Sequence, residues 1–162
     1  MTNWIPIADR GPRIAEDAVR RFEQQIGVTL PENYRSFLLD ENGGYAPANH
    51  CVFRLRKGSS VLNSLYSLDD PCESSDLASR QLYPTYPEND LPPNAIKIGY
   101  DDGGSSIVLI LSGLHRGEVW YLDRVDPRPE GSNPRVDWFD RRDVSKIATT
   151  FHEFMDSLTP LT

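Results

Sequence analysis

The chain has 162 residues, of which 38% are hydrophobic, 10% aromatic and 25% charged, and its formal net charge is −7 at pH 7. This composition excludes a disordered chain, because a domain of this length can bury roughly 70% of its unfolded surface. The excess of acidic residues argues against nucleic acid as the main partner, since phosphate binding depends on clustered Lys and Arg. We expect a single domain over residues 1–162, present as a monomer or a weak dimer.

The sequence predicts a cytoplasmic protein that does not enter a membrane. Its first 20 residues contain no apolar run, which excludes an ordinary secretory signal, and the longest apolar run, Ile107 to Leu111, is far shorter than the roughly 20 residues that span a bilayer. Cys51 and Cys72 lack the paired spacing of a zinc site and are too few for a disulfide scaffold. We expect both to be reduced thiols.

Two helices are predicted near the N-terminus. The first ends at Gly27 and has apolar residues at steps of three and four, namely Ala15, Ala18, Val19, Phe22 and Ile26. The second lies between Leu30 and Gly44, with Pro31 at its first position and Asn42-Gly43-Gly44 at its end. Because the connection between them is so short, we expect the two helices to pack as a pair.

Strand-like segments follow the helix pair. Residues 51–56 and 61–66 are joined by four residues that include Gly58, which predicts a hairpin. Three further strands are predicted at 95–100, 105–111 and 118–123, and their short connections predict an antiparallel meander. The middle strand is almost entirely apolar and should be covered on both faces.

The sequence ends in a predicted amphipathic helix that begins at Asp143 and stops before Pro160. Its apolar residues recur at steps of three and four: Val144, Ile147, Ala148, Phe151, Phe154, Met155 and Leu158. Together these elements predict an α+β fold, with a mainly antiparallel sheet on which an N-terminal helix pair and a C-terminal helix pack.

Negative charge is concentrated in the middle of the chain. From Asp69 to Asp102 there are eight acidic and two basic residues, a local balance of −6, and the part up to Pro93 is polar and proline-interrupted, with a turn of helix near 76–82. This segment is either a solvated loop that aids solubility or a binding surface for a cationic protein. In the second case its carboxylates would steer the encounter with the partner and its Tyr side chains would act as anchors. The candidate binding residues are Asp69, Asp70, Glu73, Asp76, Tyr83, Tyr86, Glu88, Asp90, Tyr100, Asp101 and Asp102.

Catalytic motifs are not evident. Asp101-Asp102-Gly103-Gly104 lacks the later ligands of a calcium loop and is more typical of a turn. Cys51 follows His50, but neighbours in a strand face opposite ways, so a nucleophile–base pair is not expected. His50, His115 and His152 have no partner identifiable by spacing. We therefore expect no enzyme activity, no cofactor and no metal site.

Several short motifs recur in one order along nearly the whole chain. They are Phe22-Glu23 with Ile26-Gly27, Leu30-Pro31 with Tyr34 and Phe37-Leu38, Asn42-Gly43-Gly44, Leu91-Pro92-Pro93, Ile98-Gly99-Tyr100-Asp101 with Gly103-Gly104, Gly117 to Asp123, and the helix from Phe151 to Leu158. In order and approximate spacing this set resembles the SUKH superfamily, which includes fungal cell-wall assembly regulators and many bacterial immunity proteins.

The resemblance implies an α+β domain without a known active site, often the antidote to a secreted toxin. Such toxins are often nucleases, which must be basic to bind phosphates, so an acidic antidote is electrostatically suited to them. The leading hypothesis is an immunity protein that binds and neutralises a cationic, nuclease-type toxin domain. A regulatory or scaffold protein that binds a host protein is the alternative, and a small hydrolase using Asp101, Asp102 or Cys51 is a third. The resemblance carries over no binding residue.

Overall fold

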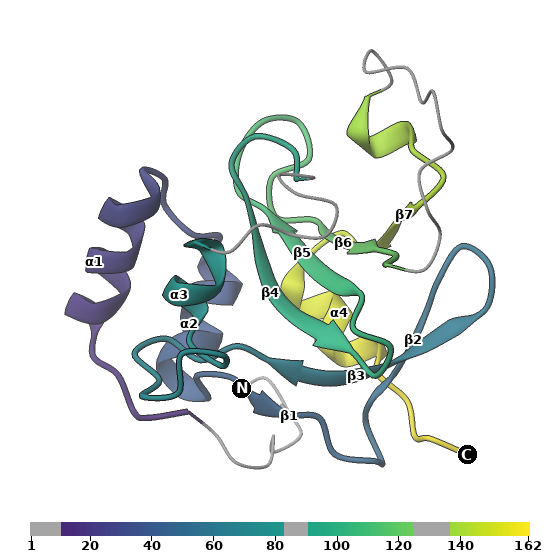
Figure 1. Ribbon diagram of the computed structural model, residues 1–162, viewed down its shortest axis with the longest axis horizontal. Coiled ribbons are helices and arrows are strands. Elements are labelled where there is room, and N and C mark those ends of the chain that lie inside the picture. The colour runs from purple at the N-terminus through teal and green to yellow at the C-terminus, as the bar shows by residue number, and fades with distance from the viewer. Residues whose placement is uncertain (1–10, 83–90, 125–136) are drawn as a thin grey trace.

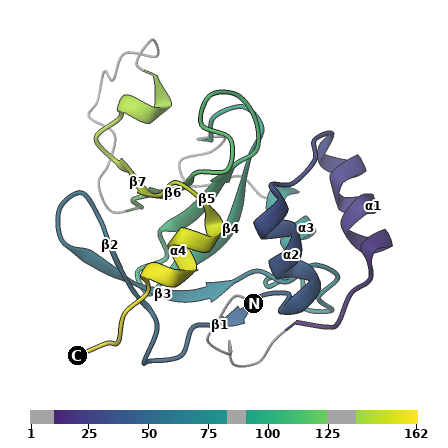
Figure 2. The same ribbon diagram turned by 180° about the vertical axis from the view of Figure 1, so that it is seen from behind.

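An antiparallel sheet organises the fold, and helices cover one of its faces (Figures 1 and 2). The computed structural model describes residues 11–82, 91–124 and 137–162. The sheet order is β1-β3-β4-β5-β6-β7, with β2 paired to β3. The strands are β1 (Gly44–Tyr45), β2 (Val52–Arg54), β3 (Ser59–Leu65), β4 (Ala95–Asp101), β5 (Ser106–Ile110), β6 (Val119–Leu122) and β7 (Val144–Ala148). The predicted α+β class is confirmed.

The helices lie in two places. α1 (Glu16–Ile26), α2 (Glu32–Asp40) and the short α3 (Leu77–Leu82) lie side by side in both views, whereas α4 (Phe151–Ser157) lies against the sheet (Figures 1 and 2). The predicted helix pair is confirmed, and Gly27 closes α1 in the left-handed conformation with a φ of 76°. α2 begins one residue later than predicted, so Pro31 flanks it. The Phe151 ring joins α4 to α2 by packing 5.0 Å from Tyr34 and 4.8 Å from Phe37.

The turn after α2 is built from residues with positive φ, as the predicted Asn42-Gly43-Gly44 helix end requires. Asn42, Gly43 and Gly44 have φ values of 51°, 82° and 123°. The buried Asn42 amide group donates to the Pro12 and Leu68 carbonyl oxygens at 2.6 and 2.9 Å and accepts from the Leu68 N–H at 2.8 Å. A Cβ atom at Gly43 would lie 2.6 Å from the Tyr66 carbonyl oxygen, so no other residue fits there without movement. Asn42 thereby ties three chain segments together.

The predicted hairpin and meander are confirmed, and β5 is buried on both faces. Ile107 and Leu109 belong to the large core with the helices, whereas Val108 and Ile110 belong to a second cluster on the other face. Trp138 and Phe139 pack against this second cluster from the 3-10 helix η1 (Trp138–Asp140). The sheet is therefore covered by helices on one side and, over β5 to β7, by η1 on the other.

The predicted helix from Asp143 to Pro160 is wrong in its first half. Residues 144–148 form β7, which pairs antiparallel with β6, and only 151–157 are helical. Val144 and Ala148 fit either the helical spacing or the alternate positions of a strand, and both are buried. Thr150 caps α4 by accepting from the Glu153 N–H at 3.1 Å, so the Thr-x-x-Glu pattern marks the true start of the helix.

Candidate functional site

The loop between β3 and α3, residues 66–76, carries the first group of predicted binding residues. It lies beside the N-terminal helices (Figure 1), and Asp69 Oδ2 is 3.6 Å from Arg21 Nη2 of α1. Asp69 and Glu73 are exposed. Asp69 has a φ of 57°, a left-handed conformation that Asp tolerates better than most residues. These two side chains are placed where a partner can reach them.

Asp70 and Asp76 hold this loop in shape. Asp76 Oδ2 accepts from the Ser79 N–H at 3.0 Å and from the Ser79 hydroxyl at 2.7 Å, which caps α3. Its Oδ1 accepts from the Asp70 N–H at 3.2 Å, and Asp70 Oδ1 accepts from the Cys72 N–H at 2.8 Å. Both carboxylates are half-buried. They contribute negative charge, but their hydrogen bonds are used within the fold.

Asp101 and Asp102 form the second group, and the structure does not bring them to the first. They lie in the β4–β5 turn beside the start of β3, whereas the 66–76 loop follows the other end of that strand (Figure 1). Asp102 is exposed and accepts from Asn63 Nδ2 at 2.9 Å. The predicted acidic residues that the structure describes therefore lie in two separate places.

The prediction that Asp101 belongs to the binding surface is wrong, because the residue is buried. It is only 3% exposed, and its carboxylate accepts from the Ser60 hydroxyl at 2.6 Å, the Tyr121 hydroxyl at 2.8 Å and the Ser105 N–H at 2.7 Å. A carboxylate with three internal donors is part of the interior and not of a contact surface. The predicted turn at these residues is present, with the Gly104 N–H donating to the Asp101 carbonyl oxygen at 3.0 Å.

Of the three tyrosines predicted as anchors, the structure describes only Tyr100. Tyr100 is half-buried, and its ring lies 5.8 Å from that of Tyr66, over which Arg80 places its guanidinium at 5.4 Å. Tyr100 is thus engaged in a tilted aromatic contact beside α3. Tyr83, Tyr86, Glu88 and Asp90 lie outside the described residues.

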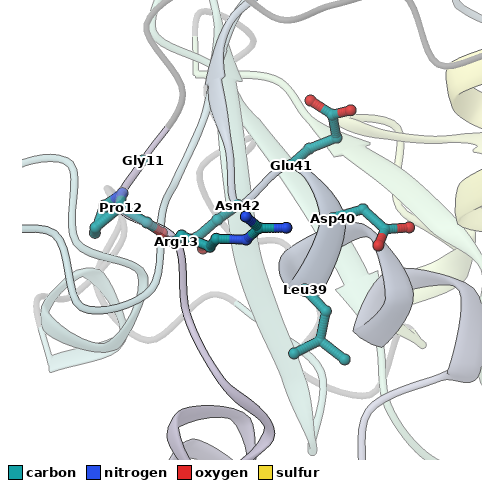
Figure 3. A pocket seen from close by; sticks show the side chains of 7 residues that line it. All are labelled: Gly11, Pro12, Arg13, Leu39, Asp40, Glu41 and Asn42. Atoms are coloured by element: carbon teal, nitrogen blue, oxygen red, sulfur yellow. Dashed lines mark hydrogen bonds between the residues drawn. The ribbon is translucent and has the colours of Figure 1, made fainter.

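A surface pocket of about 260 Å³ lies where the chain preceding α1 passes the end of α2 (Figure 3). Its charged side chains are Arg13, Asp40 and Glu41, and Figure 3 shows the Glu41 carboxylate pointing away from Arg13. Asn42, at its base, is already used in the fold. Within residues 11–82, 91–124 and 137–162, no group of three or more His, Cys, Asp or Glu side chains could hold a metal ion.

Sequence reasoning missed a polar group on the η1 side of the sheet. Glu118 Oε2 accepts from His115 Nδ1 and Trp120 Nε1, both at 2.8 Å, and its Oε1 lies 3.0 Å from Lys146 Nζ of β7. Although burial alone would raise the pKa of the Glu118 carboxyl, these donors lower it below its usual value. Glu118 and Trp120 are two residues apart in a strand-like segment and so share one face. That spacing could have revealed the pair.

The fold and these surfaces define a small α+β protein with exposed carboxylates at Asp69, Glu73 and Asp102. The sequence matches the model of the SMI1 / KNR4 family (SUKH-1) over residues 13–157, and the chain belongs to this family. The family is generally a non-catalytic binding or immunity domain, and membership indicates protein–protein interaction. No curated protein matches the chain. Among the described helices, none has the length and apolar character needed to cross a membrane.

Proposed function

We propose that this protein is a cytoplasmic immunity protein that binds a cationic, nuclease-type toxin domain and neutralises it by occupying its surface, without catalysis or a cofactor. Membership of the SMI1 / KNR4 family carries the proposal, since the family model covers residues 13–157 and the family includes immunity modules. The charge of the 66–76 loop supports the choice of a basic partner. This loop contains four acidic residues and no basic ones.

The loop suits the capture of a basic surface for two physical reasons. Exposed carboxylates such as those of Asp69 and Glu73 steer a positively charged partner and raise the association rate. The hydrogen bonds of Asp70 and Asp76 fix the loop before binding, so less conformational entropy is lost in the complex. We assign partner contact to Asp69 and Glu73, and loop ordering to Asp70 and Asp76.

Neutralisation itself is tested by co-expression. The product of an adjacent toxin gene should be lethal alone, tolerated with this protein, and recovered as a complex with it. If the chain does not protect the cell and does not bind that toxin domain, the immunity proposal fails. If the gene has no toxin gene beside it and the protein is recovered in complex with a host protein, the result would instead favour a regulatory or scaffold protein.

The surface is tested by charge reversal. The double variant Asp69→Lys and Glu73→Lys should associate with the inactivated toxin domain about tenfold more slowly at low salt, with a weaker dependence on ionic strength. The control, Asp140→Lys with Asp156→Lys, makes the same charge change at exposed positions elsewhere. If both variants slow association equally, net charge and not the loop is responsible; if neither does, the proposed surface is wrong.

A further inference from the structure

The hairpin between β2 and β3 carries three neighbouring basic side chains. Arg54, Arg56 and Lys57 are all exposed, and their side chains form no hydrogen bond or ion pair with the residues that the structure describes. Several basic side chains elsewhere are paired with carboxylates: Arg20 with Glu16, Arg35 with Glu16 and Glu23, Arg141 with Asp143, and Lys146 with Glu118. The hairpin therefore has three unpaired cations within four residues, in a chain whose net charge is −7.

The fold presents these cations on a fixed support. Phe53 is 1% exposed within the large core and Leu55 packs against the same core, so Arg54 and Arg56, which alternate with them, point together toward solvent. The Leu55 N–H closes the turn by donating to the Gly58 carbonyl oxygen at 3.0 Å. A Cβ atom at Gly58 would meet no atom within 4 Å apart from its chain neighbours, so the tip projects into solvent.

Protection of an exposed strand edge does not explain the cations. Charged side chains on an edge strand can prevent unwanted pairing with another chain. The edge of β2 is already paired at Val52, which accepts from the Thr159 N–H at 3.0 Å and donates to the Thr159 carbonyl oxygen at 2.9 Å. The C-terminal segment thus protects this edge at Val52, and Arg56 and Lys57 lie past the end of β2, where no strand pairing is at stake.

The hairpin and the acidic 66–76 loop are separate surfaces. The hairpin precedes β3 and the loop follows it, and this strand of seven residues spans about 20 Å. In both views the hairpin extends on the side of the molecule away from α1, beside which the loop lies (Figures 1 and 2). Because the Debye length is about 8 Å at physiological ionic strength, an anion at the hairpin responds to the three cations and not to the distant loop.

We propose that the hairpin is a docking site for an acidic segment of a second protein, distinct from the toxin domain. The planar guanidinium groups of Arg54 and Arg56 suit carboxylates, which they can bind through two parallel hydrogen bonds each, and Lys57 adds a third positive charge. These cations repel a basic toxin domain, so that domain is not their partner. The site goes beyond the proposed function, because a toxin domain held at the 66–76 loop leaves the hairpin free.

The charges around the hairpin favour an acidic protein segment over nucleic acid or a second copy of the chain. Asp102 is exposed at the base of the hairpin, where its N–H donates to the Val61 carbonyl oxygen at 3.0 Å. A nucleic acid, with a charge at every phosphate, would also meet this carboxylate, whereas a short acidic segment needs to meet only the cations. A second copy would bring its own net charge of −7.

The test uses a fluorescent peptide of eight glutamates with blocked ends and follows its anisotropy as the protein is added. Arg54→Gln with Arg56→Gln should weaken binding about tenfold at low salt, because two exposed charge pairs are lost, and wild-type binding should weaken as salt is added. The control, Arg13→Gln with Arg20→Gln, removes the same two charges at exposed positions elsewhere and should weaken binding less than about twofold. All four positions are exposed, so thermal unfolding should match the wild type.

Two results support the site. The first is a tenfold loss confined to the Arg54 and Arg56 variant. The second is peptide binding that persists when the inactivated toxin domain is bound. Peptide binding by a chain that binds no toxin domain would still support the hairpin and would remove the immunity proposal alone.

Other results would overturn the site. Equal losses in the two double variants, or no binding of the peptide by the wild type, would remove it and leave the immunity proposal intact, since that proposal depends on Asp69 and Glu73. Tighter binding of a single-stranded oligonucleotide, lost in the Arg54 and Arg56 variant, would assign the hairpin to nucleic acid instead. Sedimentation in which the wild type is a dimer and this variant a monomer would assign it to a second copy of the chain.

Discussion

The phenolic hydroxyl of Tyr121 in β6 donates a hydrogen bond of 2.8 Å to the Asp101 carboxylate at the end of β4, across the intervening β5. Burial, together with the neighbouring Asp101, raises the pKa of Tyr121 to about 12. The same carboxylate receives the Ser60 hydroxyl and the Ser105 N–H. Asp101 therefore joins β3, β6 and the β4–β5 turn, while its neighbour Asp102 faces solvent.

Replacing Asp101 should destabilise the protein far more than replacing Asp102. In Asp101→Asn the amide nitrogen cannot accept from the surrounding donors, so we expect a loss of about 2–3 kcal/mol in the free energy of unfolding. Asp102→Asn removes one charge at an exposed position and should change it by less than about 0.5 kcal/mol. Urea unfolding of the two variants measures the difference, and equal values would show that the network contributes nothing.

These neighbouring aspartates illustrate how far sequence reasoning reaches. Asp101-Asp102-Gly103-Gly104 was enough to predict the turn, because Asp-Gly is a local signal. Which carboxylate is buried depends on Ser60 and Tyr121, which lie 41 and 20 residues away in the chain. The separation of Asp102 from Asp69 likewise follows from β3 lying between them and not from local composition.

The fold was more predictable than the surface. Gly27 and Asn42-Gly43-Gly44 end helices through left-handed backbone conformations that Gly and Asn adopt more readily than other residues, a signal that can be read locally. The sequence predicts a helix for residues 144–148 because their spacing fits a helix as well as a strand, and pairing with β6 makes them a strand. Position 99 requires glycine because of a contact with another strand: a Cβ atom there would lie 2.4 Å from the Ser64 carbonyl oxygen of β3.

Tyr34→Phe should stabilise the protein. The Tyr34 ring is fully buried between Phe37 and Phe151, and its hydroxyl has no hydrogen-bond partner among the described residues. Removing a buried, unsatisfied hydroxyl while keeping the ring should raise the free energy of unfolding by about 1 kcal/mol. Tyr121→Phe is the control, because its hydroxyl is bonded and its loss should be destabilising. Destabilisation by Tyr34→Phe in urea unfolding would mean that the hydroxyl is satisfied.

Lys97 should make stability rise with pH in mildly alkaline solution. Its side chain is 4% exposed, and burial, with a smaller contribution from Arg80, lowers its pKa to about 8. Above pH 8 the unfolded chain holds this proton more tightly than the folded one, so the free energy of unfolding should increase by about 2 kcal/mol between pH 7 and pH 9.5. The rise is absent well below pH 8, where Lys97 is protonated in both states.

Two variants isolate this effect in urea unfolding across that pH range. Lys97→Met should abolish the increase, because the titrating group is gone, whereas Lys57→Met, at an exposed position of the β2–β3 hairpin, should retain it. Burial raises the pKa of Cys51, Tyr66 and Tyr121, so these groups oppose the rise once the unfolded thiol ionises at about 8.5 and unfolded tyrosines at about 10. The contribution of Lys97 is therefore the difference in slope between the wild type and Lys97→Met. An unchanged slope in Lys97→Met would assign the pH dependence to other groups.

Glu118 should have the opposite pH dependence. Its carboxyl pKa is lowered in the folded state, so its contribution is fully present above the unfolded pKa of about 4.3 and is lost as the pH falls through the folded value. Glu118→Gln keeps the side-chain shape but loses the charge that Trp120, His115 and Lys146 bind, and should cost about 2 kcal/mol at pH 7. As the pH falls below about 4.3 the unfolded carboxyl takes up its proton before the folded one, so the difference should shrink toward pH 3. Asp156→Asn, exposed on α4, is the control, and a difference between Glu118→Gln and wild type that stays constant from pH 7 to pH 3 would refute an ionic role for Glu118.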